Sequence, residues 1–353
     1  MRVLYFGTYE RDYPRNAQVI EALRRAGVAV DEWNMPVWTA RDNWRGGARQ
    51  AVRLATAELR LLLRRPEQPY DALLVGYPGH LDLPAARRAA RGAPVVFNPL
   101  VSLADTLVSD RRRFGAGSPA ARLLEWIDRR ALCAADVVVA DTRANADRLA
   151  GIAGLPPEHV DVCFVGAEER LFSPPWQPQG PPLFVGKLIP LHGLETIIAA
   201  AALLPEVRLR VVGSGQEDGL LRARPPSVEW LRWLPYAELP DADRSAACAL
   251  GIFGTGPKAR RVIPNKVFQA LACGTPVITA DTPAACELLV DGESALLVPP
   301  GDPVALSAAV GRLVGDPQLA RRIGDGGLRA YREHASEEVL GHRWRRLLER
   351  AVS

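Results

Sequence analysis

The feature that most constrains the fold is a regular alternation of short apolar segments with segments of helical periodicity. Apolar segments occur at 3–6, 28–33, 72–75, 95–97, 137–139 and 162–164, and again at 183–185, 207–212, 228–231, 250–253, 277–280 and 295–298. Helical patterns lie between them, for example at 16–26 and 194–204. Strands that alternate with helices form βαβ units, because parallel neighbours need a crossover connection. We therefore predict an α/β protein with doubly wound parallel sheets.

A proline-rich segment at 171–182, LFSPPWQPQGPP, interrupts this alternation with five prolines in twelve residues. Such a composition makes a stiff connector. The 353 residues also exceed one ordinary domain. We predict an N-terminal domain at 1–170, a linker at 171–182 and a C-terminal domain at 183–335. The segment 336–353 has apolar residues at helical spacing and is predicted to be a helix that packs on the N-terminal domain.

Composition excludes several classes of protein. The net charge of +4 is too small to indicate a nucleic-acid partner. The five cysteines form no CxxC pair and have no histidine at a metal-ligand spacing, so we expect reduced core thiols, no metal site and a cytoplasmic location. The N-terminus lacks the apolar core of a signal peptide, and no run of 18 apolar residues is present.

Two strand ends carry glycines that suit an anion. Gly186 and Lys187 follow one strand, and His192 and Gly193 precede a helix six residues later. A loop between a strand and a helix N-terminus presents backbone N–H groups and a positive helix end to a phosphate. The alternative is an ordinary βα loop with incidental charges. Gly213, in a GSG turn after the next strand, lets either a ligand or a neighbouring backbone approach closely.

A third segment, 260–278, reads RRVIPNKVFQALACGTPVI. Pro264 suits the first position of a helix, Asn265 can cap it, and Gly274 ends it. Lys266 and Gln269 then lie in the first turn and a half, where an ammonium can neutralise a diphosphate and an amide can bind sugar hydroxyls. The alternative is a packing helix with solvated basic residues.

These segments resemble the retaining glycosyltransferases of family four, also called group 1, which have the GT-B fold. The loop 186–193 is similar to the family's diphosphate element, 270–278 to its donor-site signature, and 284–302 to the pattern downstream of it. The resemblance implies two facing Rossmann-like domains with a cleft between them. It also implies a hexosyltransferase-type enzyme whose donor is a nucleoside diphosphate sugar, UDP- or GDP-linked, with no other cofactor. The acceptor would be a glycan, a lipid-linked molecule or a small secondary metabolite.

The chain departs from the family at both motif glutamates, where Arg261 and Gln269 stand. The resemblance implies that Gln269 keeps a weakened contact with the ribose. Arg261 inverts the charge that faces the transferred sugar, which would suit an acidic donor or a moved phosphate contact. Glu287 is expected either near the donor or as a cap of a nearby turn. The donor-site residues that the resemblance implies are Gly7, Gly186, Gly213, Arg261, Ile263, Asn265, Gln269 and Glu287.

In this family the acceptor attacks from the face that the diphosphate leaves, so charge on the leaving group is what needs stabilising. The resemblance assigns that role to Lys187, His192 and Lys266. The pKa of His192 should rise beside a diphosphate. In the first domain, Arg15 and Asn16 could hold a phosphate or sugar. Asp105 is the ionisable residue nearest to the place where relatives carry a histidine.

Two further patterns have competing interpretations. Asp241 and Asp243 match an Asp-x-Asp metal motif, but a helix cap is the favoured reading. The segment 41–65 alternates arginines with apolar residues behind Trp44, which fits a helix lying on the inner face of an anionic membrane or, by preference, a core-packed helix with a solvated basic face. At the level of function, the alternatives are an epimerase on the same fold, which the loss of both glutamates disfavours, and a binding subunit without catalysis.

Overall fold

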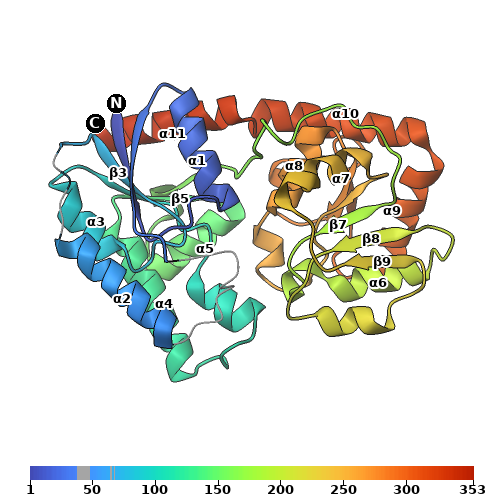
Figure 1. Cartoon of the computed structure of the whole chain (residues 1–353), viewed down its shortest axis with the longest axis horizontal. Helices are drawn as coiled ribbons and strands as arrows, with labels where there is room; N and C mark the ends of the chain where they lie inside the picture. Colours follow the sequence, from blue (N-terminus) through green and yellow to red (C-terminus); the bar gives the residue numbers. More distant parts are fainter. Residues whose placement is uncertain (38–47, 64–65, 67) are drawn as a thin grey trace. The chain divides into compact units, whose positions relative to one another are not determined.

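The structure is a computed structural model that describes residues 1–37, 48–63, 66 and 68–353. The chain forms two compact units, coloured along the sequence in Figure 1. The first contains Met1–Val108, Arg113–Val165 and Glu337–Ser353, and the second contains Ser109–Arg112 and Gly166–Ser336. The proline-rich segment thus belongs to the second unit. The reason is hydrogen bonding: Trp176 Nε1 donates to the carbonyl of Ala246, and Arg244 donates to the carbonyls of Leu171 and Ser173.

The first sheet is parallel and six-stranded, in the order β2-β1-β3-β4-β5-β6. Its strands are largely apolar because helices cover both faces of a parallel sheet. The elements before Gly166 are β1 (Arg2–Gly7), α1 (Pro14–Arg25), β2 (Ala29–Asn34), α2 (Ala48–Leu63), β3 (Ala72–Val75), α3 (Leu83–Ala90), β4 (Val95–Phe97), η1 (Asp105–Asp110), α4 (Pro119–Ala134), β5 (Val137–Ala140), α5 (Arg143–Ala153), η2 (Pro157–His159) and β6 (Val160–Val162).

The second sheet is also parallel, in the order β12-β11-β10-β7-β8-β9. Numbered within the unit this is 6-5-4-1-2-3, the strand order of a dinucleotide-binding domain, with the topological switch between β7 and β10. Its elements are β7 (Leu183–Val185), η3 (Pro190–His192), α6 (Leu194–Ala202), β8 (Leu209–Val212), η4 (Asp218–Ala223), β9 (Val228–Leu231), η5 (Tyr236–Glu238), α7 (Leu239–Ser245), β10 (Ala249–Leu250), η6 (Ala259–Arg261), α8 (Asn265–Cys273), β11 (Val277–Ala280), η7 (Ala285–Glu287), β12 (Leu296–Val298), α9 (Pro303–Gly315) and α10 (Pro317–His334).

The last helix, α11 (Glu337–Val352), packs on α1 within the first unit, and Figure 1 shows the two helices side by side. Trp344 is buried, and Arg345 donates to the carbonyl of Ala26. A side chain at Gly341 would overlap the carbonyl oxygen of Ala22. Close backbone approach and burial of the apolar face therefore fix this helix on the first unit.

The predicted α/β fold with doubly wound parallel sheets is confirmed. The strand expected at 162–164 is displaced, since β6 ends at Val162. The physical reason is Arg15, which is completely buried and donates to the carbonyls of Cys163 and Phe164 at 3.1 and 2.8 Å. Arg15 Nε also donates to Asn98 Oδ1 at 3.0 Å. The prediction that Arg15 contacts a phosphate is therefore wrong, because its side chain is buried and connects segments of the first unit through hydrogen bonds.

Asn16 is likewise structural. It is completely buried, accepts hydrogen bonds from Tyr5 Oη and the Tyr77 amide, and donates to the carbonyls of Glu10 and Tyr77. The expectation of buried thiols also needs correction, because Cys133 and Cys286 are exposed while Cys163, Cys248 and Cys273 are buried.

Candidate active site in the second unit

The site is built at the topological switch of the second sheet, where the loops after β7 and β10 meet. In open α/β sheets this is the crevice in which ligands bind. Gly193, at φ +68°, is the N-cap of α6, and a Cβ there would lie 2.5 Å from the carbonyl carbon of Phe253. A Cβ at Gly254 would lie 2.5 Å from the carbonyl oxygen of Leu191. Glycines thus allow the two loops to pack backbone against backbone, as strand–loop–helix geometry at this edge requires.

The GSG turn after β8 uses its glycines for the same purpose. Gly213 has φ +141°, and a Cβ there would overlap the carbonyl oxygen of Gly186. A Cβ at Gly215 would lie 2.5 Å from the carbonyl oxygen of Leu188. Of the two readings left open by the sequence, the structure gives a neighbouring backbone as the partner of both glycines. Gly213 contributes to the site by holding Gly186 in place.

Helix α8 presents the first turn predicted from the sequence, with a shift at its start. Pro264 is the N-cap and Asn265 the first helical residue, and no side chain caps the helix. The prediction that Asn265 caps the helix was therefore wrong by one position. Pro264, whose backbone is extended, is the N-cap, and Asn265 is already helical. Gly274, at φ +76°, ends the helix as predicted. Lys266 and Gln269 are one turn apart on one face.

Lys266 is the central cation of the site. Its ammonium is buried and has no hydrogen-bond partner among the described residues. The Nζ atom lies 3.7 Å from the centroid of the Phe184 ring, and a Cβ at Gly186 would lie 2.8 Å from it. Burial holds the pKa of Lys266 well below its ordinary value, against the opposing charge of Asp243. A buried ammonium without a hydrogen bond is costly, so this position calls for an anionic partner.

His192 lies beside Lys266. The imidazole is buried, packs edge-on against Phe184 with 5.4 Å between centroids, and Nδ1 donates to the carbonyl of Lys187 at 2.5 Å. This bond leaves Nε2 as the nitrogen that can face a ligand. In the protein alone the pKa of His192 is well below its ordinary value, because of burial and then the charge of Lys266. The rise expected from the sequence applies only when a bound diphosphate outweighs these two effects.

Asp243 is the acidic group behind Lys266. It is buried in α7, and burial raises its pKa to about 8 against the influence of Arg244 and Lys266. Asp241 is exposed and pairs with Arg244. Neither aspartate caps the helix, which begins at Leu239, so the capping prediction was wrong. Asp243 could not be predicted as a neighbour of Lys266 from local spacing, because the two residues come together only through the packing of α7 on α8.

Gln269 is part of a second cluster of hydrogen-bonded side chains. It is buried, and its Nε2 donates to Tyr236 Oη at 3.3 Å. Tyr236 Oη donates to Glu168 Oε1 at 2.8 Å, and Arg170 Nη2 donates to Glu168 Oε2 at 3.1 Å. Burial and the carboxylate of Glu168 raise the pKa of Tyr236, so its hydroxyl stays protonated. Glu168 was not identified from the sequence.

The remaining predicted donor residues of the second unit lie in loops and short 3-10 turns. Lys187 is exposed in the loop after β7, and Ile263 is buried just before α8. Arg261 ends η6 and Glu287 ends η7, and both are half-buried. The amide of Ala284 donates to the carbonyl of Arg260, which connects the segments that carry Arg261 and Glu287.

Two predicted residues belong to the first unit. A Cβ at Gly7 would overlap the Asp82 carboxylate, which accepts bonds from the amide and hydroxyl of Thr8 at 2.8 and 2.9 Å. Gly7 therefore has an internal packing role. Asp105 is buried and accepts from Arg148 Nη2 at 3.0 Å and Nε at 3.3 Å.

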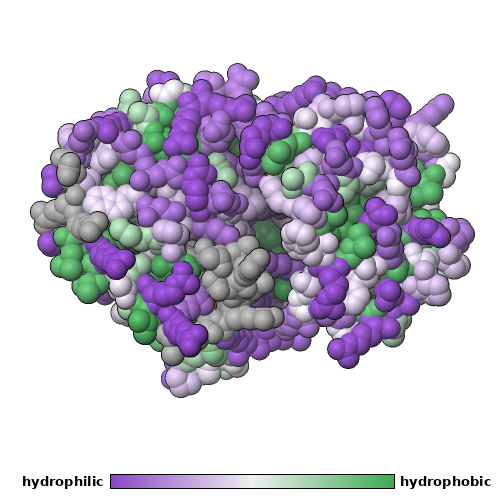
Figure 2. Space-filling model, viewed as in Figure 1, coloured by the Kyte–Doolittle hydropathy of each residue, from purple (hydrophilic) through white to green (hydrophobic). Residues whose placement is uncertain are grey.

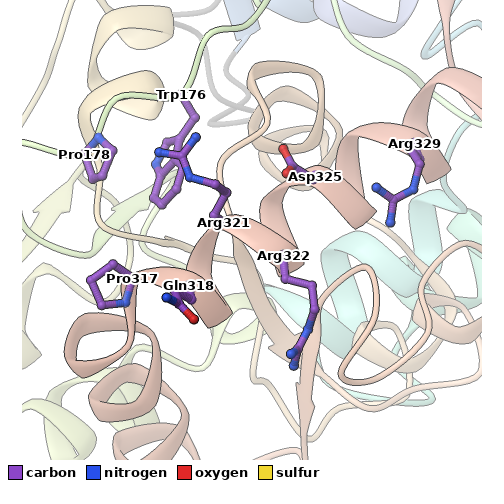
Figure 3. Close-up of a pocket in the computed structure, with 8 residues that line it drawn as sticks. All are labelled: Trp176, Pro178, Pro317, Gln318, Arg321, Arg322, Asp325 and Arg329. Atoms are coloured by element: carbon purple, nitrogen blue, oxygen red, sulfur yellow. The ribbon is translucent and has the colours of Figure 1, made fainter.

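A separate groove of about 460 Å³ lies on the second unit, away from these loops. Its lining, shown in Figure 3, comes from the proline-rich segment and α10: Trp176, Pro178, Pro317, Gln318, Arg321, Arg322, Asp325 and Arg329. It contains none of the predicted site residues. Within the described ranges, no three His, Cys, Asp or Glu side chains are grouped so that they could hold a metal ion.

The fold and the site together define a GT-B protein. The structure resembles sucrose-phosphate synthase from Thermosynechococcus elongatus, with a TM-score of 0.73 and 17% identity over 99% of this chain and 98% of that one. It also resembles Anabaena Alr3699/HepE in complex with UDP-glucose, with a TM-score of 0.71 and 16% identity over 99% of this chain and 100% of that one. At these identities the likeness shows the fold alone.

The family follows from two sequence models. "Glycosyl transferase 4-like domain" matches residues 2–166, and "Glycosyl transferases group 1" matches residues 182–316. The chain therefore belongs to the group 1 glycosyltransferases. A curated relative, the D-inositol 3-phosphate glycosyltransferase of Streptomyces bingchenggensis, is 31% identical over 241 residues, which cover 59% of this chain and 51% of the relative. The chain spans about half the length of the curated relatives it matches.

Proposed function

We propose that the chain transfers a sugar, with retention of configuration, from a nucleoside diphosphate sugar to a glycan, a lipid-linked molecule or a small-molecule acceptor. The observation that carries this proposal is the buried Lys266 ammonium, which has no hydrogen-bond partner in the described part of the chain and is enclosed by Gly186, His192 and Phe184. A diphosphate would supply the missing negative charge and acceptors. UDP is the first nucleotide to test, because the Anabaena structure was determined with UDP-glucose.

The reaction would need no protein nucleophile. The acceptor oxygen forms a bond to the anomeric carbon as the bond from that carbon to the diphosphate breaks, and a leaving phosphate oxygen takes the acceptor proton. Lys266, His192 and Lys187 would stabilise the charge that develops on the diphosphate, a role that preorganised cations serve without a metal ion. Gly186, Gly213, Ile263 and Asn265 would shape the donor site, and Gln269, Arg261 and Glu287 would contact the donor.

The first unit would supply the acceptor side, with the loop after Gly7 near it. Asp105 was predicted to act there. Because Arg148 binds both of its carboxylate oxygens, a positioning role suits Asp105 better than proton transfer.

A thermal-shift screen of UDP, GDP, ADP and dTDP tests donor binding. A ligand at 100 times its Kd stabilises the protein by about 2.7 kcal/mol, so one of the four should raise the Tm and the others should raise it less. Incubation with the matching nucleotide sugars and acceptors should then release the nucleoside diphosphate. Binding without any release would favour the alternative of a non-catalytic subunit, and no shift with any nucleotide would contradict the proposal.

A second proposed property is contact with the inner face of the cytoplasmic membrane. Within the described part of 41–65, helix α2 exposes Val52, Leu59 and Leu63 among arginines, while Leu61 is buried in the core. The segment 41–47, including Trp44, and residues 64–65 lie outside the described residues. Exposed apolar and basic residues on one helix suit an anionic bilayer surface. Figure 2 shows hydrophobic patches beside strongly hydrophilic ones on this unit. No helix in the described ranges is long and apolar enough to span a bilayer.

Sedimentation with phosphatidylglycerol vesicles tests this contact. The protein should sediment at low salt and less at high salt, because screening weakens its attraction to the charged surface. Changing Leu59 and Leu63 to Glu should abolish sedimentation. Leu203→Glu is the matched control, since Leu203 is a leucine of similar exposure in the second unit, and it should sediment like the wild type. Equal sedimentation of both variants would contradict the proposal.

A further inference from the structure

In the cluster of Gln269, Tyr236 and Glu168, the donor or acceptor character of each group determines which way the hydrogen bonds of Gln269 run. The Glu168 carboxylate can only accept hydrogen bonds, and it accepts one from the hydroxyl group of Tyr236. The Tyr236 oxygen must then accept from its other neighbour, and only the Nε2 side of the Gln269 amide can donate. The raised pKa of Tyr236 keeps this proton in place. Arg170 Nη2 donates to the second carboxylate oxygen of Glu168, so that this oxygen also has a partner.

The side-chain amide oxygen of Gln269 is therefore the group that can bind a ligand. It accepts no hydrogen bond from any described residue, whereas Nε2 is committed to Tyr236. A glutamine free to rotate could offer either a donor or an acceptor to a ligand. Here the chain of bonds from Glu168 allows only the acceptor.

The position of Gln269 on α8 indicates which part of a ligand its amide oxygen can contact. Gln269 follows Lys266 by three residues on α8, so both side chains leave the same face of the helix. An anion at Lys266 therefore has the Gln269 oxygen one helical turn away. A ligand that uses both needs an anionic group and, next to it, a hydroxyl that can donate.

We propose that Tyr236 and Glu168 are positioning residues that fix the Gln269 amide with its oxygen toward the hydroxyl groups of an organic diphosphate. The inference rests on the proposed function, since it assigns a hydroxyl-recognising part to the same donor site. It makes recognition of the nucleoside separable from recognition of the diphosphate. Lys266 and His192 bind the anion, and the Gln269 cluster distinguishes a hydroxyl-bearing diphosphate from inorganic pyrophosphate.

Isothermal titration of the full chain with UDP and with inorganic pyrophosphate tests the inference. Tyr236→Phe removes the hydroxyl and frees the amide, so UDP affinity should fall about three- to tenfold, the worth of one oriented hydrogen bond. Pyrophosphate affinity should stay unchanged. Glu168→Gln should act in the same way, because a glutamine can donate to Tyr236 and reverse the chain of bonds. Tyr70→Phe is the matched control, a partly buried tyrosine beside Asp31 in the first unit, and should change neither affinity.

A rescue separates positioning from mere packing. Adding Gln269→Glu to Tyr236→Phe supplies a carboxylate, which accepts in either orientation, and should restore UDP affinity. If Tyr236→Phe leaves UDP affinity unchanged, or lowers UDP and pyrophosphate affinity equally, the inference is overturned while the proposed function stands. If the wild type binds neither UDP nor GDP, ADP or dTDP, the proposed function and the inference both fail.

Discussion

Replacing Lys266 with methionine should abolish nucleotide-sugar transfer and at the same time make the protein more stable. The ammonium supplies the charge that a leaving diphosphate needs, and removing one preorganised group of this kind costs about 10²–10³-fold in rate. We therefore expect kcat/KM to fall at least that far, with UDP affinity falling as well. Release of UDP from the nucleotide sugar measures the loss.

The gain in stability has a separate cause. In the protein alone the Lys266 ammonium is buried and has no hydrogen-bond partner among the residues that the structure describes, and a buried donor left without a hydrogen bond costs about 1–3 kcal/mol. The contact of the ammonium with the Phe184 ring offsets part of this cost, and a methionine sulfur makes a comparable contact with the ring. The free energy of unfolding of Lys266→Met should thus exceed that of the wild type by about 1 kcal/mol. Lys187→Met is the matched control for stability, because Lys187 is exposed in the same site and its loss should leave the Tm unchanged.

The lowered pKa of Lys266 also predicts that the free energy of unfolding depends on pH. The pKa of Lys266 is lower in the folded protein than its unfolded value of 10.5, so the unfolded chain binds more protons between those two values. Stability from this residue is therefore full above 10.5 and is lost as the pH falls toward the lowered folded pKa. The stability advantage of Lys266→Met should be smallest near pH 10.5 and should grow as the pH falls from there toward neutral. An advantage that persists at high pH, or is absent at neutral pH, would contradict the account.

Asp243 has an opposite effect, and its pH range ends near pH 8. Its pKa is raised from 3.8 to about 8, so the folded protein binds the proton more tightly. Stability from Asp243 is full below 3.8 and is lost as the pH rises through about 8. Measurements between pH 8 and 10.5 therefore report mainly on Lys266.

Gly213→Ala should be the most destabilising single change near the site. The backbone at φ +141° is strained for any residue with a side chain, at a cost of about 1–3 kcal/mol. The new methyl group would also overlap the carbonyl oxygen of Gly186, which is backbone and cannot rotate away. From the two effects together we expect the free energy of unfolding to fall by more than about 3 kcal/mol, as large losses come from specific mechanisms such as backbone strain and steric overlap.

The urea midpoint of unfolding measures this effect. The control is Gly219→Ala in the same unit, because a Cβ at Gly219 meets no atom within 4 Å. Alanine there should change stability by less than about 1 kcal/mol, and a slight gain is expected from the smaller entropy of the unfolded chain. If both variants unfold at the same urea concentration, the contact between Gly213 and Gly186 does not constrain the loop.

Local features of the site were predictable because short spacings encode them. Gly274 ends α8 in the left-handed conformation that its position after the helical pattern indicated. The start of α8 was predicted to within one residue, since a proline followed by a helical pattern restricts where the first turn can begin. The role of Arg15, in contrast, was not predictable in this way. Arg15 looked like a ligand contact and is an internal strut, because burial depends on elements that sequence spacing does not report.

The sequence by itself determined two parallel doubly wound domains, the glycine turns at their strand ends, and Lys266 and Gln269 on one face of a helix. Periodicity and turn chemistry act over a few residues, so they can be read from the order of the chain. Only the tertiary structure decided what these two side chains meet. Phe184 and Asp243 reach Lys266 from other elements, and Gln269 is joined to Tyr236 across 33 residues and Tyr236 to Glu168 across 68. Packing of separate elements sets the charge of one side chain and the orientation of the other, and no local pattern carries that information.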